Sequence, residues 1–202
     1  MSDPRAVITA EDVYAVAPGD ELVVPPGSHV TPWARELAAS RGVRLHEGPA
    51  QGPGNVVALG ADHGGFQVKE DLKPHLARLG WKALDLGTHS AEAVDYPDFA
   101  RAVALAVRHG RARFGIVVDG AGTGSCMAAT KVRGVRAALC VDAAAARNAR
   151  EHNDAQVMTL GARFVRPETL PELLQAFLGS HCTEARHRRR VELIMRIEEQ
   201  GR

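Results

Sequence analysis

The chain has 202 residues, of which 45% are hydrophobic and 4% aromatic, and its formal net charge at pH 7 is +1. This length suits one α/β domain with a small appendage, and the near-neutral charge argues against nucleic acid or an anionic membrane as a partner. No stretch approaches the ~20 apolar residues of a membrane span. The first residues lack the basic and apolar segments of a signal peptide, so we expect a cytoplasmic protein.

We interpret residues 1–53 as an N-terminal extension and linker. Thr31 and Pro32 are suited to the N-cap and the first position of a short helix. The chain breakers of residues 48–54 predict the linker. The extension is short for a core of its own. We therefore expect it to dock on the main domain, on a second copy or on another partner.

Residues 54–202 alternate between short apolar runs and helical patterns, and no internal repeat stands out in the chain. The expected strands are residues 56–59, 82–86, 114–118, 137–140 and 157–160, and the expected helices are residues 66–79, 97–108, 125–131, 143–151, 167–178 and 184–199. Such alternation predicts a doubly wound, Rossmann-like α/β fold with a five-stranded parallel sheet and helices on both faces.

Three cysteines, Cys126, Cys140 and Cys182, lie far apart and form no CxxC pair. This spacing argues against a disulfide framework and against a zinc site. We expect no metal and no cofactor.

Three polar segments are expected at strand ends: residues 62–65, residues 119–125 and, just past a helix, residues 152–154. In a doubly wound sheet the ligand binds at the carboxyl ends of the strands, so we expect these segments to gather there. The middle one, Asp-Gly-Ala-Gly-Thr-Gly-Ser, is rich in glycine and precedes a helix. Glycines let backbone N–H groups converge on an anion at a helix N-terminus. A tight structural turn is the alternative, and the segment lacks both the P-loop lysine and the dinucleotide fingerprint.

Six motifs together resemble the ribose-5-phosphate isomerase B family, which includes the two subunits of galactose-6-phosphate isomerase. In chain order they occupy residues 62–65, 95–97, 119–131, 150–154, 161–163 and 186–190. The resemblance covers about three quarters of the chain. It implies an aldose–ketose isomerase of phosphorylated sugars, most readily ribose 5-phosphate to ribulose 5-phosphate through a cis-enediolate. It also implies a homodimer or a dimer of dimers with shared active sites.

The resemblance further implies a role for each matching residue. Asp62 and His63 contact the sugar, and His152 assists ring opening beside Asn153; a histidine stabilised by a helix C-terminus is the alternative for His152. The implied substrate-binding residues are His63, Tyr96, Gly120, Gly122, Thr123, Gly124, Ser125 and Asn153. The implied phosphate-binding residues are Arg163, Arg186, His187 and Arg190. Arg186 and Arg190 share one helix face, for which a solvated basic surface is the alternative.

The chain departs from the family at the catalytic base. Many members have Cys where this chain has Asp119, and another branch has a Glu base where it has Ser125. In addition, Ala121 replaces a hydroxyl residue and Thr130 replaces an Asn. One hypothesis makes Asp119 the base, with catalytic Asp62 and His152, because partial burial would raise the Asp119 pKa toward the working pH. The other makes the chain a companion, similar to the galactose-6-phosphate isomerase chain that works beside a Cys-bearing partner, so that its base comes from elsewhere.

The extension has a resemblance of its own. Residues 24–27 and 31–37 resemble short segments in enzymes of bacterial microcompartments. This implies a docking or encapsulation element that contacts a shell or cargo protein. A packing extension that caps the oligomer is the alternative.

Overall fold

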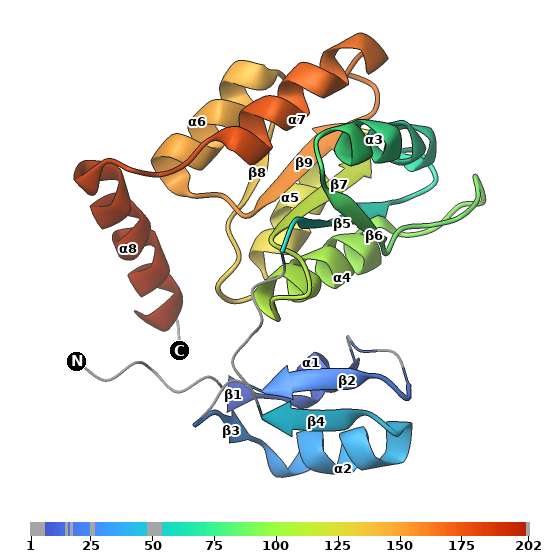
Figure 1. Ribbon diagram of the computed structural model, residues 1–202, viewed down its shortest axis with the longest axis vertical. Helices are drawn as coiled ribbons and strands as arrows, with labels where there is room; N and C mark the ends of the chain where they lie inside the picture. The colour runs from blue at the N-terminus through green and yellow to red at the C-terminus, as the bar shows by residue number, and fades with distance from the viewer. Residues whose placement is uncertain (1–6, 15, 17, 25–26, 48–53, 201–202) are drawn as a thin grey trace. The chain divides into compact units, whose positions relative to one another are not determined.

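The structure, a computed structural model, describes residues 7–14, 16, 18–24, 27–47 and 54–200 (Figure 1). The chain divides into two compact units, Met1–Gly54 and Asn55–Arg202. Each unit has a hydrophobic core of its own. The predicted linker, apart from its last residue, lies outside the described residues.

The described part of the first unit contains six short elements. They are β1 (Val7–Ile8), α1 (Ala10–Tyr14), β2 (Glu21–Val24), β3 (His29–Val30), α2 (Pro32–Arg41) and β4 (Arg44–Glu47). Thr31 caps α2 as predicted, because its Oγ1 accepts a hydrogen bond of 3.3 Å from the N–H of Ala34. Buried aliphatic side chains from strands and helices form the core of this unit, although a segment of this length was expected to need a neighbour.

This unit repeats a strand–helix–strand motif, a structural repeat that does not stand out in the sequence. Val7 pairs in parallel with His29, 22 residues further on, and Glu21 pairs in parallel with Arg44, 23 residues further on. The two copies share little sequence beyond an aliphatic residue and a Thr before each helix. The repeat is visible only in the pairing of the strands.

The second unit has the predicted architecture, a parallel sheet in the order β6-β5-β7-β9-β8. The strands are β5 (Val56–Ala61), β6 (Lys82–Asp85), β7 (Phe114–Asp119), β8 (Ala137–Leu139) and β9 (Val157–Gly161). The helices are α3 (Phe66–Arg78), α4 (Tyr96–Arg108), α5 (Thr123–Thr130), α6 (Ala143–Asn153), the short 3₁₀ turn η1 (Pro167–Thr169), α7 (Leu170–Gly179) and α8 (Ala185–Gln200).

Helices cover both faces of this sheet, as Figure 1 shows: α3, α6 and α7 lie on one side and α4 and α5 on the other. The central strand β7 is buried along its whole length, as expected for a parallel strand covered on both faces. On the first side Phe114 of β7 contacts Phe177 of α7 with ring centroids 5.7 Å apart. This double cover explains why the strands are apolar runs rather than alternating patterns.

The strand order reverses beside β5, which lies between β6 and β7. From β5 the chain first crosses to β6 and then returns to the other side of β5 to form β7. In doubly wound sheets the ligand cleft lies at the carboxyl ends of the strands at such a switch point. The turns that follow β5 and β7 are therefore the first place to look for a site.

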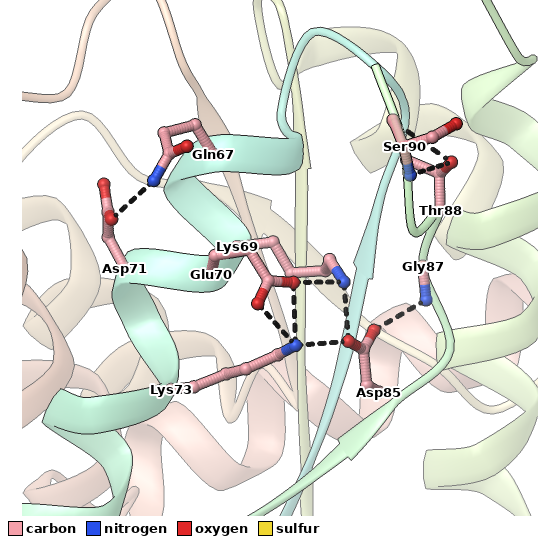
Figure 2. A network of polar contacts seen from close by, with 9 residues as sticks. All are labelled: Gln67, Lys69, Glu70, Asp71, Lys73, Asp85, Gly87, Thr88 and Ser90. Atoms are coloured by element: carbon pink, nitrogen blue, oxygen red, sulfur yellow. Dashed lines mark hydrogen bonds and ion pairs between the residues drawn. The ribbon is translucent and has the colours of Figure 1, made fainter. Parts of the chain in front are cut away.

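A partly buried ion-pair network joins α3 to the end of β6 (Figure 2). The Nζ of Lys69, a fully buried side chain, lies 2.6 Å from Asp85 Oδ2 and 2.9 Å from Glu70 Oε1. Lys73 completes the network at 2.6 Å from the same Asp85 oxygen. Burial raises the pKa of Asp85, but hydrogen bonds from Lys69 and Lys73 outweigh it and hold the pKa below its usual value. The same two lysines lower the pKa of Glu70.

We expect Lys69→Ala to destabilise the protein by about 3 kcal/mol at neutral pH, because it removes the fully buried partner of the partly buried Asp85 and Glu70 carboxylates. Lys73→Ala is the matched control, and it should cost less because that side chain is one-third exposed. Carboxylates with lowered pKa values stabilise the fold above their ordinary pKa values, 4.5 for Glu70 and 3.8 for Asp85, and lose this effect as the pH falls below them. Urea denaturation should therefore show the difference between wild type and Lys69→Ala shrinking below pH 4.5. A difference that stays constant with pH would contradict this reading.

Candidate active site

Two turns meet at the switch point of the sheet. Asp62 follows β5 directly, is 7% exposed, and accepts a hydrogen bond of 2.9 Å at Oδ1 from the N–H of Gly65. Its own N–H donates to the carbonyl of Val118 on β7, at 3.3 Å. Gly65 lies against the same carbonyl, since a Cβ built on it would stand 2.1 Å from that oxygen. The first two predicted segments are thus brought together.

The second turn is organised by the carboxylate of Asp119. Its Oδ1 accepts hydrogen bonds from the N–H groups of Ala121, at 2.7 Å, and Gly122. Its Oδ2 accepts from the N–H of Ser125, at 3.1 Å, and from the hydroxyl of the same residue. The carboxylate is therefore the internal anion around which the glycine-rich turn folds at the start of α5.

The expectation that burial raises the pKa of Asp119 is wrong. Burial does act in that direction, but the hydrogen bonds from the Ser125 hydroxyl and from the N–H groups of Gly122, Ala121 and Ser125 outweigh it. Together they hold the pKa of Asp119 below its usual value, because donors that face a carboxylate favour its charged form.

Other predicted residues surround these turns. Tyr96, the first residue of α4, lies so close to Gly124 that a Cβ built on the glycine would stand 2.5 Å from the tyrosine ring. Nδ1 of the exposed His63 lies 3.2 Å from the backbone nitrogen of Val94. The guanidinium of Arg163, in the turn after β9, approaches Gly120, with Nε 3.6 Å from where a Cβ would stand. This edge of the sheet thus gathers carboxylates, an imidazole, a phenol and a cation around the first turn of α5.

The third predicted segment lies elsewhere, so its expected placement at a carboxyl end is wrong. His152 and Asn153 form the last turn of α6, and Asp154 caps that helix before β9 begins. Because α6 runs back between two parallel strands, this cap lies at the amino edge of the sheet. β9 has five residues, and at ~3.3 Å per residue the two edges lie about 13 Å apart along it.

The start of α8 joins His152 at this second place. The rings of His152 and His187 stack at a centroid distance of 4.0 Å with an interplanar angle of 11°. His187 is only 3% exposed, whereas Arg186 and Arg190 are exposed and Arg186 pairs with Glu184 at 2.6 Å. The sequence-predicted residues thus form two half-sites, the Asp62 half at the carboxyl edge and the His152 half at the amino edge.

The family model described as Ribose/Galactose Isomerase matches residues 57–194. The chain belongs to this family. It is 41% identical to ribose-5-phosphate isomerase B of Escherichia coli (strain K12) over 143 residues, which are 71% of this chain and 96% of that protein. The structure of Clostridium thermocellum ribose-5-phosphate isomerase B gives a TM-score of 0.71 at 40% identity, over 73% of this chain and 99% of that chain. The Mycoplasma genitalium enzyme with bound ribulose-5-phosphate gives 0.67 at 37%, over 71% of this chain and 96% of that chain.

In this member of the ribose/galactose isomerase family, two ion pairs that were not predicted from the sequence hold the His152 half-site in place. We call this pair of contacts the Asp154 clamp. Asp154, with a left-handed φ of 46°, pairs through its carboxylate with Arg150 at 2.8 Å and with Arg136 at 2.9 Å. Nε of Arg136 also donates to the carbonyl of Asn153, at 3.0 Å. The i, i+4 spacing of Arg150 and Asp154 is a sequence pattern that predicts an ion pair on a helix. Arg136 is too distant in sequence for its ion pair with Asp154 to be predicted.

Cys126 and Cys140 are poorly suited to replace the cysteine base that the resemblance implies for many family members at position 119. Burial raises the pKa of Cys126 and raises that of Cys140 to about 12, so both thiols are protonated at neutral pH. Within the described residues, no group of three or more His, Cys, Asp and Glu side chains could hold a metal ion. The described helices include none with the length and apolar character needed to cross a membrane.

Proposed function

We propose that the chain isomerises ribose 5-phosphate to ribulose 5-phosphate through a cis-enediolate, and that residues 55–202 carry this activity. The observation that supports it best is the Asp62 half-site, where a buried carboxylate stands beside a glycine-rich helix N-terminus. The relatives of the chain from Escherichia coli and Clostridium thermocellum bear the name ribose-5-phosphate isomerase B. The reaction needs a base for the proton shared by C1 and C2, and donors for the enediolate oxygen.

The resemblance implies that backbone N–H groups of residues 120–124 hold the enediolate. Because those of Ala121 and Gly122 donate to Asp119, the first turn of α5 would supply the donors instead. The N–H groups of Thr123 and Gly124 have no acceptor within the helix, because the first four N–H groups of any helix lack one. They point out of the helix N-terminus, where a developing oxyanion is stabilised. Tyr96 and His63 would bind sugar hydroxyls beside them, and Arg163 would bind the phosphate.

The two half-sites suggest that a second copy of the chain completes each active site. Within one chain the sheet separates His152 and Asn153 from Asp62. A two-fold related copy could bring its His152 half-site, with Arg186 and Arg190, to the Asp62 half-site. Three apolar residues of α8, Leu193, Ile194 and Ile197, are exposed within the chain and would suit such a contact.

An isomerase assay on the purified chain alone tests the proposal. We expect ribulose 5-phosphate to form from ribose 5-phosphate. Galactose 6-phosphate, the alternative substrate, is assayed separately. Activity on galactose 6-phosphate alone would move the substrate from a pentose to a hexose phosphate. Inactivity on both would favour the companion hypothesis, in which a partner chain supplies the base.

We infer a separate role for the first unit, docking inside a bacterial microcompartment. Its own core and its exposed aromatic residues, Trp33 at 65% and Tyr14 at 52%, favour an interaction module over a packing extension. Deletion of residues 1–54 should then leave isomerase activity and oligomeric state unchanged, while removing co-sedimentation with purified compartments. Loss of the oligomer, measured by light scattering, would support a packing extension instead.

A further inference from the structure

The proposed isomerase reaction needs a catalytic base, and several acid–base groups lie at the carboxyl edge of the sheet. Asp119 stands where the resemblance implies a Cys in many family members, but hydrogen bonds already occupy the acceptor positions of its carboxylate. Each of its two oxygens accepts two hydrogen bonds, three from backbone N–H groups and one from the Ser125 hydroxyl. A carboxylate offers about four acceptor positions in all. Asp119 could take a proton from carbon only by breaking a contact that shapes its own turn.

Asp62 lies beside Asp119, and most acceptor positions of its carboxylate have no hydrogen-bond donor within the described residues. The strands β5 and β7 are paired, with Ala61 opposite Val118, so Asp62 and Asp119 leave the sheet side by side. Within the described residues, the N–H of Gly65 is the one hydrogen-bond donor to the Asp62 carboxylate, and it is bound at Oδ1. Oδ2 therefore retains its acceptor positions. The side chain is nine-tenths buried, which limits competition from water.

The other groups at this edge are less suited to the proton transfer. Ser125 is completely buried, and its hydroxyl donates a hydrogen bond to Asp119. The Cys126 thiol is protonated at neutral pH because burial raises its pKa. The imidazole of His63 is exposed, and its Nδ1 is engaged by the backbone of Val94.

We propose that Asp62 is the base that carries the proton between C2 and C1, and that Asp119 is a positioning residue that anchors the enediolate-binding turn. The proposal rests on the proposed isomerase function. The Asp62 carboxylate takes the proton from C2, and the electrons of the C2–H bond form the C1–C2 double bond. The carbonyl electrons move to O1, whose charge faces the N–H groups of Thr123 and Gly124. The hydroxyl proton of O2 then passes to O1, Asp62 returns its proton to C1, and the ketone forms at C2.

This assignment gives Asp119 the role that a bound anion has in other helix N-termini. Its charge holds the N–H groups of Ala121 and Gly122, so the turn is shaped before substrate arrives. The N–H groups of Thr123 and Gly124 remain for the substrate, because that of Ser125 also donates to Asp119. Residues 119 and 125, the two positions at which the resemblance implies a base, are here hydrogen-bonded to each other, and both shape the turn.

Two variants separate the candidate bases, each measured beside the wild type for conversion of ribose 5-phosphate and for exchange of the C2 proton with D₂O. Asp62→Asn should lower kcat by about 10³-fold and abolish the exchange, since general base catalysis contributes 10²–10⁴-fold. The asparagine amide oxygen can still accept from Gly65, so the turn should stay folded, and far-UV circular dichroism checks this. KM should change much less than kcat, because the hydrogen-bonding shape of the side chain is kept.

Ser125→Ala removes one donor from Asp119 and should raise the pKa of that carboxylate. If Asp62 is the base, the low-pH limb of kcat/KM stays at the wild-type position in this variant. Movement of that limb to higher pH would make Asp119 the base and overturn the proposal. C2 proton exchange at the wild-type rate in Asp62→Asn would also overturn it. A wild-type chain without isomerase activity would instead overturn the proposed function, and with it the assignment.

Discussion

Gly65→Ala is expected to destabilise the second unit by about 3 kcal/mol or more, because it forces atoms into an occupied backbone position. The new Cβ would stand 2.1 Å from the carbonyl oxygen of Val118 and 2.5 Å from its carbon. Both belong to β7, the buried central strand, and neither can rotate away as a side-chain end could. The start of α3 would have to leave the sheet, and the Asp62–Gly65 hydrogen bond would be lost with it. Urea denaturation measures the loss as a lower midpoint at unchanged slope.

Gly64→Ala is the matched control for this prediction. It makes the same chemical change one residue earlier, where the nearest atom to the new Cβ is Asp62 Oδ1 at 3.4 Å. This is an ordinary contact, so we expect the variant to cost less than about 1 kcal/mol. Equal midpoints for the two variants would show that α3 can shift away from β7 at little cost, contrary to the close approach at Gly65.

Much of the second unit could be predicted because its signals are local. The apolar runs of the strands, the helical patterns between them and the glycines after residues 62 and 119 are each contained within a few residues. Alternation of strands and helices then dictates a parallel sheet with right-handed connections. The turns after β5 and β7 were consequently placed at one edge, where the structure confirms them.

The predictions that were wrong or missing depend on three-dimensional relations, which a pattern of residues along the chain does not contain. His152 was grouped with the strand ends because of its residue type, whereas the direction of α6 places it at the opposite edge. The pKa of Asp119 depends on four donors whose convergence is set by the φ and ψ angles of the turn, and burial alone predicted the wrong sign. The clamp of Arg136 on Asp154 joins residues 18 apart in sequence and has no local signature.

The separation of the two half-sites leads to the second large expected effect, the rescue of activity by mixing two inactive variants. Asp62→Asn and His152→Ala should each abolish most activity as homodimers. In a heterodimer of the two, one active site receives both substitutions, and the other receives the intact Asp62 of one chain and the intact His152 of the other. Half of the dimers in an equal mixture are heterodimers, so about a quarter of wild-type activity should return after the chains exchange partners.

The matched control mixes two variants of the same half-site, Asp62→Asn and Arg163→Ala. Every site in such a heterodimer contains one of the two substitutions, because both residues lie at the carboxyl edge of the same chain, and no activity should return. Mixing should be done under mild denaturant with removal of the denaturant before the assay, and ribulose 5-phosphate formation is the readout. If the first mixture stays as inactive as its components while exchange is verified by native mass spectrometry, His152 and Asp62 do not act in a site shared between two copies of the chain. The His152–His187 stack would then be a structural contact between α6 and α8 within one chain.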